Sequence, residues 1–325
     1  MNASIEHRAA AAIRVIEPGM LTTVQDLGRV GHRSDAVVTG GAADRLALRL
    51  GNRLLGNVES AAALELTHTG CTLEALTAIR VLIAGECDVS VETRGTRSAR
   101  SCWRVIDLGA RDSLIVAAMR RGARACVCIG GGIDVPPILG SRSTHLAAGF
   151  GGLAGRALRR GDELVIGDHN ATPSDESNCE PARALHESVA FRTTLRCIDS
   201  AHTDDFGPEA IQALYACEFA VSNQSDRRGV RLVGSIVARA GDGTLPSEGM
   251  MPGAIQIPPS GEPIILGVDH PATGGYPLIA CVIEADHAAI AQLRPRDRVR
   301  FQRVAIDGAR NATRELEAQI RRFGM

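Results

Sequence analysis

The sequence contains no lysine, so all 36 of its basic residues are arginines. This absence excludes a Walker A lysine, a lysine Schiff base, a lysine general base and a biotin group attached to a lysine of this chain. If the protein handles phosphate, it must use arginine side chains, backbone N–H groups or a partner chain. If it handles biotin, that biotin must be carried by another chain.

The sequence also has few aromatic residues and a net charge close to zero. Only 3% of the residues are aromatic, with a single tryptophan, Trp103, and the formal net charge at pH 7 is −1. Nucleic-acid binding requires a concentrated basic face or aromatic platforms for base stacking, and the composition offers neither. The composition therefore favours a small molecule or another protein as the binding partner.

Cysteine spacing indicates neither a metal site nor a disulfide framework. The nine cysteines are odd in number, include no C-x-x-C pair and mostly lie in apolar runs. Such residues are typical of buried free thiols in a reducing compartment. No apolar run approaches the roughly 20 residues needed to cross a bilayer, and the N-terminus does not resemble a signal peptide. We therefore expect a soluble, cytoplasmic protein without a bound metal ion.

Chain length and the distribution of polar residues predict two domains, because 325 residues exceed one ordinary domain. Residues 168–188 are polar, contain proline and show no apolar periodicity, as expected of a linker. We predict an N-terminal domain over residues 1–170, a linker over 171–189, a C-terminal domain over 190–305 and a tail over 306–325.

Local signals in both halves favour β-structure with a few short helices. Apolar spacing predicts a short amphipathic helix over residues 44–55, and glycine and proline divide most of the remainder into short strands. The segments 108–116, 158–166 and 293–301 share a leucine, an aspartate four residues later and then alternating apolar residues. A turn closed by aspartate and followed by a half-buried strand gives this spacing. The sequence therefore predicts a mainly β (β-rich α+β) fold with two β-barrel-like domains.

The segment 247–277 places polar and turn-forming residues between two short apolar runs. A proline- and glycine-containing turn is expected to expose Ser260, and Gln256 precedes this turn in a predicted strand. An ordinary tight turn explains Ser260 equally well, and Gln256 either lines a lumen or faces solvent. We assign both residues as candidate catalytic groups.

The loop that follows the apolar run 264–268 is a stronger candidate. It contains Asp269 as the candidate catalytic acid or base. Paired glycines permit positive φ and a close approach of backbone N–H donors to an anion. Adjacent side chains on an extended chain point apart, and a lone histidine is more often only hydrogen-bonded. The candidate substrate or anion ligands in this loop are His270, Thr273, Gly274, Gly275 and Tyr276.

Two further residues complete the candidate site. Arg227, in the loop 222–232, is suited to bidentate binding of phosphate or carboxylate, although a solvated basic turn explains the same spacing. Glu248 is close in sequence to the same rim. In the N-terminal half, we expect Asp26 and Arg29 to form an ion pair with a structural role.

Five segments together resemble the KipA/PxpC family, whose members are called the C subunit of 5-oxoprolinase, allophanate hydrolase subunit 2 or biotin-dependent carboxyltransferase family proteins. These segments are PGMLTTVQDLGR at 18–29, LGNRLLGN at 50–57, GGIDVPPILGSRST at 131–144, SEGMMPGAIQIPPSGEPI at 247–264 and DHPATGGYP at 269–277. The resemblance extends from about Ile13 to Phe301. It implies a cyclophilin-like barrel in the C-terminal domain.

The resemblance also implies an activity that depends on partners. In the 5-oxoprolinase branch, this activity is ATP-dependent opening of 5-oxo-L-proline to L-glutamate, with a KipI/PxpB-like subunit and a PxpA-like third subunit. Which subunit binds ATP is left open. In the urea carboxylase branch, a related module transfers a carboxyl group from carboxybiotin to urea. The alternatives are therefore a carboxyltransferase component and a non-catalytic regulator that binds a KipI-like kinase inhibitor.

Three departures from the family pattern fall in or near the candidate site. The usual S-G-A-M-D is G-G-A-A-D at 40–44, and the usual S-N-R-M-G is S-D-R-R-G at 225–229, which keeps Arg227. The usual D-x-Q-T-T-G-G-Y-P is DHPATGGYP at 269–277. These changes concern the identity of the substrate rather than the fold.

Overall fold

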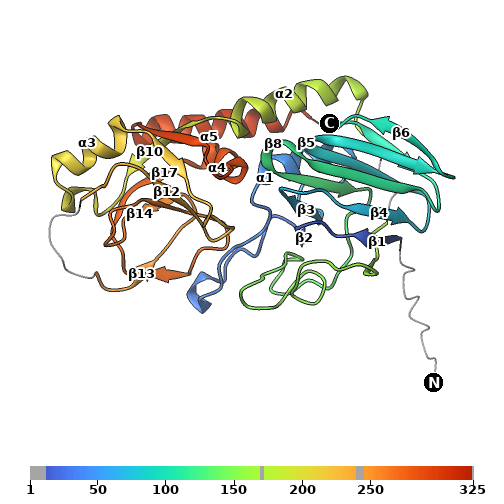
Figure 1. Ribbon diagram of the computed structural model, residues 1–325, viewed down its shortest axis with the longest axis horizontal. Helices are drawn as coiled ribbons and strands as arrows, with labels where there is room; N and C mark the ends of the chain where they lie inside the picture. The colour runs from blue at the N-terminus through green and yellow to red at the C-terminus, as the bar shows by residue number, and fades with distance from the viewer. Residues whose placement is uncertain (1–11, 169–171, 239–244, 324–325) are drawn as a thin grey trace.

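The computed structural model describes residues 12–168, 172–238 and 245–323 of the chain. In these residues, an N-terminal sheet and a C-terminal barrel lie side by side, and helices α2 (Cys179–Ala190) and α5 (Ile306–Ile320) extend along the top of the molecule in Figure 1. The predicted mainly β fold with a few helices is confirmed. The first 11 residues of the predicted N-terminal domain lie outside the described residues.

The N-terminal strands form a nine-stranded sheet that curves into a half-barrel. Two long strands, β5 and β8, organise this sheet, because they pair with each other and with β3, β4, β6 and β7. The pairing of β5 with β8 is irregular between Ala84 and Val89, and such bulges bend a strand. The strands are β1 (Ile13–Glu17), β2 (Leu21–Gln25), β3 (Ala63–Thr67), β4 (Thr72–Ala75), β5 (Ile79–Thr93), β6 (Thr96–Arg100), β7 (Val105–Leu108), β8 (Ser113–Ile129) and β9 (Glu163–Leu164).

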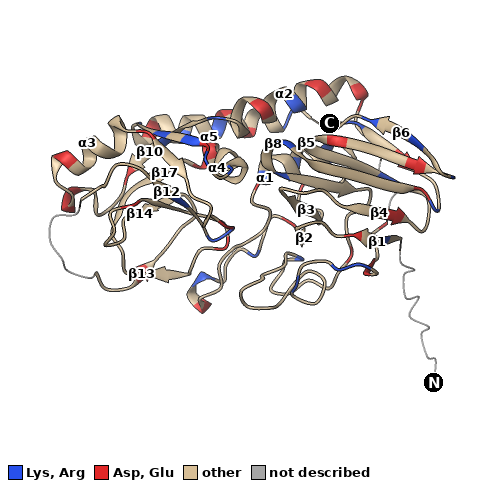
Figure 2. Ribbon diagram, in the orientation of Figure 1, with Lys and Arg blue, Asp and Glu red and all other residues tan. Residues whose placement is uncertain are grey.

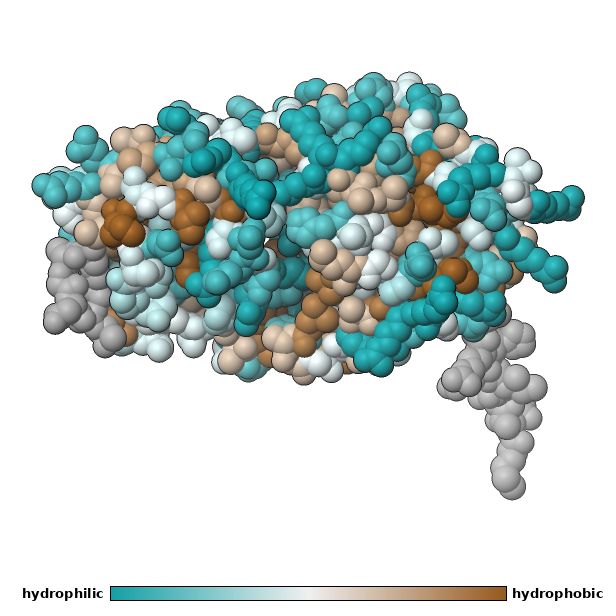
Figure 3. Space-filling model, viewed as in Figure 1, coloured by the Kyte–Doolittle hydropathy of each residue, from teal (hydrophilic) through white to brown (hydrophobic). Residues whose placement is uncertain are grey.

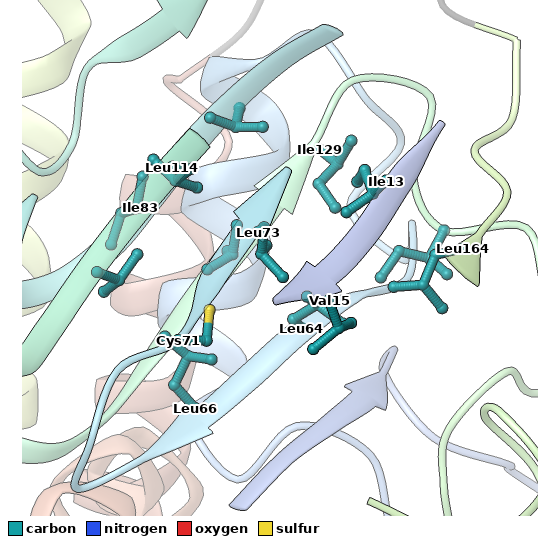
Figure 4. Close-up of a cluster of buried hydrophobic side chains, with 14 of the residues drawn as sticks. Ile13, Val15, Leu64, Leu66, Cys71, Leu73, Ile83, Leu114, Ile129 and Leu164 are labelled. Atoms are coloured by element: carbon teal, nitrogen blue, oxygen red, sulfur yellow. The ribbon is translucent and has the colours of Figure 1, made fainter. Parts of the chain in front are cut away.

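The main apolar core lies inside the curve of this sheet. Figure 4 shows Ile13 of β1, Leu64 of β3 and Leu73 of β4 gathered with Leu114 of β8 and Leu164 of β9, and all five are buried. Alternate residues of a strand point to the same face, so each of these five strands contributes side chains to this cluster. Full burial of each such side chain stabilises the fold by about 1.5–3 kcal/mol.

Helix α1 (Arg45–Leu54) covers the other face of the sheet and confirms the helix predicted over 44–55. Asp44 caps it, because one carboxylate oxygen accepts a hydrogen bond from the backbone N–H of Ala47 at 2.9 Å. The helix buries Leu46, Leu50 and Leu54 together with apolar residues of β5 and β8. This second cluster fixes the loop that precedes α1 against the sheet.

The stretch predicted as a linker contains helix α2. Asp44 Oδ2 lies 2.7 Å from Nε2 of His186, which is fully buried, so α2 is attached to the N-terminal end of α1. The buried face of α2 consists of small or polar residues such as Ala182 and His186 rather than leucines. The polar composition of the predicted linker therefore gave no indication of a helix that packs against α1. Residue 171, where the predicted linker begins, lies outside the described residues.

The C-terminal strands close into a barrel in the order β10-β17-β14-β15-β12-β11-β18. A parallel pair, β10 with β18, closes it, while the other pairs are antiparallel. Helices α3 (Pro208–Ala216) and α4 (His287–Gln292) accompany the barrel. The barrel strands are β10 (Thr194–Asp199), β11 (Phe219–Val221), β12 (Gly229–Val233), β14 (Ala254–Gln256), β15 (Ile264–Leu266), β17 (Leu278–Val282) and β18 (Arg298–Arg303). The more specific expectation of a cyclophilin-like barrel stays a prediction.

Shorter elements complete the described part of the chain. Strands β13 (Glu248–Gly249) and β16 (Thr273–Gly274) form a separate two-stranded ribbon. The predicted tail forms α5, which returns to the N-terminal sheet: Ile320 is buried, and Nη2 of Arg49 lies 2.8 Å from Oε2 of Glu317. Single-turn 3-10 helices lie at Arg33–Asp35, Glu176–Asn178, Thr203–Asp205 and Glu284–Asp286.

The surface carries charge of both signs. Figure 2 shows acidic and basic residues interspersed along α2 and the neighbouring strands, and Figure 3 shows apolar residues of the same face in scattered patches. None of the described helices is long and apolar enough to span a membrane. The described ranges also contain no group of three or more histidine, cysteine or acidic residues placed to hold a metal ion.

Candidate functional site at the domain interface

The expected ion pair between Asp26 and Arg29 is wrong. The Asp26 carboxylate instead accepts hydrogen bonds from the hydroxyls of Ser141 (2.6 Å) and Ser143 (2.5 Å), and from the backbone N–H groups of Gly28 (2.7 Å) and Arg142 (2.6 Å). Four donors satisfy the carboxylate without a guanidinium. Asp26 therefore joins the loop after β2 to the loop after β8, and Arg29 is left free of it.

Arg29 is almost completely buried, with 1% of its surface exposed. Its Nη2 donates to the carbonyl of Ser143, and its guanidinium carbon lies 4.8 Å from the centre of the Phe150 ring. Its Nε and Nη1 have no hydrogen-bond partner among the described residues. Burial lowers the pKa of this guanidinium. Because buried polar groups in proteins are nearly always hydrogen-bonded, the two unpaired donors indicate a position for a ligand.

Gly40 leaves space beside these donors. A Cβ atom at this position would lie 3.5 Å from both Nη1 of Arg29 and Oδ1 of Asp269. Its φ of +60° is also one that residues other than glycine rarely adopt. Because Gly40 has no side chain, the space between the Arg29 guanidinium of the N-terminal part and the Asp269 carboxylate of the barrel stays unfilled.

Asp269 is held by Arg227, and the strand register explains why. Strands β12 and β15 pair with Gly229 opposite Leu266, so the loop before β12 and the loop after β15 leave the barrel side by side. Arg227 Nε lies 2.7 Å from Oδ2 of Asp269, and Nη2 lies 3.2 Å from Oδ1. Two parallel N–H···O bonds of this kind fix the plane of the carboxylate.

Arg227 also connects the barrel to the N-terminal sheet. Its Nη1 donates to Glu65 on β3, and its Nη2 donates to the carbonyl of Gly41 at 2.7 Å. A second buried cation, Arg124, lies 3.7 Å from the same Glu65 oxygen. Burial lowers the pKa of Arg227, but the charges and hydrogen bonds of Glu65 and Asp269 outweigh it and raise the net pKa. Since its donors are engaged by the protein, we interpret Arg227 as positioning Asp269 rather than binding a substrate anion.

His270 is buried next to this network, with 2% of its surface exposed. Its Nδ1 lies 2.6 Å from the carbonyl of Pro271, and its Nε2 has no partner among the described residues. Burial lowers the pKa of the imidazole, so the ring is neutral at pH 7. A neutral ring that donates from Nδ1 has a lone pair on Nε2 that can accept a hydrogen bond.

Four of the remaining candidate residues lie at or beside the two-stranded ribbon of β13 and β16. Glu248 is paired with Gly274 in this ribbon, and its carboxylate lies 3.2 Å from Nε2 of His202. Gln256 is buried, and its side-chain amide nitrogen lies 3.0 Å from the position that a Cβ of Gly274 would take. The predicted residues Glu248, Gln256, Thr273 and Gly274 are therefore neighbours, in a group separate from the Arg227 network.

Ser260 and Tyr276 are exposed, as is Thr273. Ser260 is exposed on the turn between β14 and β15, where its hydroxyl accepts a hydrogen bond from the backbone of Glu262 at 3.4 Å. Tyr276 is 44% exposed and follows Gly275 after the ribbon. No hydrogen bond connects either side chain with Asp269 within the described part of the chain. The catalytic role of Ser260 stays a prediction.

A cleft of about 1120 Å³ lies next to the domain interface, although Arg29, Asp269 and His270 are not among its lining residues. It lies between α1, α5 and the barrel, and its lining includes Thr39 and Val268, the sequence neighbours of Gly40 and Asp269. Arg45 also lines it and donates from Nη2 to the carbonyl of Gly40 at 3.2 Å. A volume of this size accommodates a small-molecule substrate.

Sequence reasoning missed Glu65 and Arg124 and gave Arg29 only a structural role. One signal was available for Glu65, because it stands within the apolar run ALELT of β3, where an ionised side chain needs a buried partner. Arg124 is similarly enclosed within β8. No local pattern identifies Arg227 as the partner of Glu65, since 162 positions separate them.

Comparisons with known proteins agree with this architecture. Residues 36–303 match the family model described as "Carboxyltransferase domain, subdomain A and B". The chain is 35% identical to the C subunit of 5-oxoprolinase from Escherichia coli over 93% of its length and 94% of that protein. It is 33% identical to the corresponding 5-oxoprolinase protein of Haemophilus influenzae over 96% of its length and 98% of that protein.

Solved structures of larger proteins contain the same fold. The structure of the urea amidolyase of K. lactis superposes on 97% of this chain with a TM-score of 0.86 and 29% identity, but this chain corresponds to only 20% of that protein. The structure of TTHA0988 superposes on 92% with a TM-score of 0.75 and 28% identity, and this chain corresponds to 56% of it. The resemblance drawn from the sequence motifs is confirmed, and the chain belongs to the carboxyltransferase domain family, subdomains A and B.

Proposed function

We propose that the protein is a subunit of an ATP-dependent 5-oxoprolinase-type enzyme, which opens 5-oxo-L-proline to L-glutamate together with a KipI/PxpB-like and a PxpA-like subunit. The main support is the match over more than nine-tenths of both chains to two proteins named as the C subunit of 5-oxoprolinase. Because these relatives are named as subunits, the proposal includes partner chains. In the yeast urea amidolyases, by contrast, the matching region is 18% of the protein.

The interface has groups that suit this substrate. 5-Oxo-L-proline carries a carboxylate, an amide N–H and an amide carbonyl. The unpaired Nε and Nη1 of Arg29 are suited to the carboxylate or to the carbonyl oxygen, whose developing negative charge a fixed donor stabilises. Asp269 and the Nε2 lone pair of His270 are the acceptors available for an N–H group.

The interface offers little unshared positive charge for the triphosphate of ATP. The buried carboxylates of Asp269 and Glu65 already pair with Arg227, and Glu65 also lies 3.7 Å from Arg124. In this proposal, ATP would be bound elsewhere in the complex and would supply the phosphoryl group that activates the amide. The residues of this interface bind and orient the substrate.

The proposal is tested by reconstitution. We would combine the chain with its KipI/PxpB-like and PxpA-like subunits and measure ADP and L-glutamate formation that depends on 5-oxo-L-proline. Arg29→Gln is expected to raise the KM for 5-oxo-L-proline, because it removes the charge that faces the substrate. Arg228→Gln is the matched control, since Arg228 is exposed and, within the part of the chain that the structure describes, pairs only with Asp226, at 2.9 Å. Absence of turnover in the complete wild-type mixture would refute the assignment.

A carboxyltransferase function is the second candidate. It is favoured by the name of the matching family and by TM-scores of 0.86 and 0.85 to the urea amidolyase and urea carboxylase structures. In this case the carboxylated biotin would be carried by another chain, because this one has no lysine. Activity that requires bicarbonate and a biotin carrier, and does not require 5-oxo-L-proline, would favour this candidate over the first.

A further inference from the structure

A second pocket, of about 360 Å³, lies outside the candidate site where the β8 bulge, the end of α2 and the barrel meet. Gly122, Phe191 and Gln292 form part of its lining. Two acidic residues, Glu218 and Asp297, also line it. Positive charge predominates, because six arginines line the same pocket: Arg120, Arg121, Arg192, Arg294, Arg298 and Arg300.

Two of these arginines are anchored by the protein and still have free N–H groups. Arg294 donates to the carbonyl of Gly122 and, at 2.6 Å, to that of Met119, which leaves Nη1 unused. Arg192 donates to the carbonyl of Ser188 at 2.8 Å and to Asp286 at 3.1 Å, which leaves Nη2 unused. Such anchoring fixes the direction of the remaining donors before a ligand arrives.

The other four arginines of the pocket are paired with fewer carboxylates than there are arginines. Arg298 and Arg300 share one carboxylate, that of Glu218, at 3.8 and 3.2 Å, and each uses only Nε. Arg121 lies over the ring of Phe191 at 4.1 Å, and no carboxylate is within salt-bridge distance of it in the described part of the chain. Among the described residues, Arg120 pairs only with the exposed Asp88, at 3.0 Å. A net positive pocket therefore remains.

We propose that this pocket binds an oligophosphate, as inorganic pyrophosphate or tripolyphosphate or as the phosphate chain of a nucleotide. Planar guanidinium groups match phosphate oxygens bidentately, and several of them around one pocket suit a ligand with several negative charges. A single carboxylate or sulfate would engage only part of this set. Asp297 accepts a hydrogen bond from the backbone N–H of Arg294 at 2.7 Å, and the six arginines outnumber the two carboxylates of the lining.

The pocket is distinct from the candidate substrate site but connected with it. Gln292, at its floor, accepts a hydrogen bond from the backbone N–H of Arg124 at 3.0 Å and donates to Asp44 at 2.6 Å. Arg124 is the residue whose side chain lies 3.7 Å from Glu65. The oligophosphate proposal rests on the pocket residues alone and does not depend on the proposed enzyme activity.

The test is a binding titration of the full chain by isothermal calorimetry. The probes are pyrophosphate, tripolyphosphate, ADP and ATP, with sulfate and a deca-glutamate peptide as comparisons. We expect tripolyphosphate to bind at least about tenfold more tightly than sulfate, with an affinity that falls as salt increases. Equal affinity for tripolyphosphate and ATP would assign recognition to the phosphates, and tighter binding of ATP would add a nucleoside contact. Binding of deca-glutamate without binding of any oligophosphate would overturn the proposal.

A pair of triple variants separates the pocket from general surface charge. Arg121→Gln/Arg298→Gln/Arg300→Gln removes three exposed arginines of the pocket and is expected to weaken tripolyphosphate binding about tenfold or more. The control is Arg97→Gln/Arg100→Gln/Arg104→Gln, which removes three exposed arginines on and after β6 and lowers the net charge equally. Equal weakening in both triple variants, with unchanged thermal unfolding, would refute a specific site.

Discussion

Replacing Arg227 by leucine tests the role of the buried ion network directly. Arg227 donates two hydrogen bonds to Asp269, one to Glu65 and one to the carbonyl of Gly41. The substitution removes the cation and leaves two carboxylates that are 8% and 2% exposed. We therefore expect a large loss of stability together with a loss of coupling between the sheet and the barrel.

The expected loss of stability depends on the partners that each carboxylate retains when Arg227 is replaced. Glu65 retains the backbone N–H of Ala43 at 2.6 Å and Arg124 at 3.7 Å, so it stays partly compensated. Asp269 loses its only salt bridge among the described residues. Breaking a buried ion pair by removing one partner generally costs about 3–5 kcal/mol, and we expect a value in this range. Combining Arg227→Leu with Asp269→Asn should restore about half of it, because Asp269 is the carboxylate left without a charged partner, whereas Glu65 still faces Arg124.

Urea unfolding followed by two probes measures both effects. Trp103, the single tryptophan, is buried in the N-terminal sheet region, so its fluorescence reports that part, while far-UV circular dichroism reports both. In the Arg227→Leu variant, the two transitions should separate as well as shift to lower urea. The control is Arg228→Leu, which removes an exposed pair with Asp226 and should cost less than about 1 kcal/mol. A loss below about 1 kcal/mol for Arg227→Leu as well would refute the reasoning.

Three further results are expected. Asp269→Asn should abolish turnover of the reconstituted enzyme while circular dichroism stays unchanged, and full activity would remove Asp269 from the site. Gly40→Ala should cost about 1 kcal/mol in urea unfolding through its positive φ and should also raise the KM, because its methyl group would enter the space beside Arg29; an unchanged KM would show that this space is not used. Burial lowers the pKa of folded His270 below the unfolded value of about 6.5, so the unfolded state binds the proton more readily and stability should fall as pH decreases from 7 towards 5. His270→Gln should flatten that decline, and an identical pH profile would contradict it.

The fold was largely predictable because its signals are local. The apolar spacing of α1 and its capping Asp44 lie within a few residues of one another, and the same holds for the proline at the start of α3. Closure of the barrel depends on the parallel pairing of β10 with β18, which are about a hundred positions apart. Helix α2 within the predicted linker was not predicted, because its buried residues are mostly alanine, cysteine and histidine, which carry little hydrophobic signal.

The candidate site was predictable only in part, for the same reason. Asp269 and Arg227 were identified because each lies in a loop with unusual polar and glycine content, yet their contact depends on the register between β12 and β15. The partner of Asp26 was predicted from proximity in sequence, and serines more than a hundred positions away took that place. Short-range patterns identify residues able to do chemistry, whereas long-range pairing decides which of them meet.

The absence of lysine gives the interface a property that bears on its substrate. A buried lysine can release its proton, but arginine stays charged, so each buried guanidinium requires a compensating anion. Arg227 has Glu65 and Asp269, and Arg124 shares Glu65. Arg29 has no carboxylate within salt-bridge distance among the described residues, because Asp26 is engaged by serines and backbone N–H groups. The charges of Asp26 and Asp269 still act on Arg29 and favour its charged form, so what Arg29 offers a substrate is its unpaired Nε and Nη1 donors.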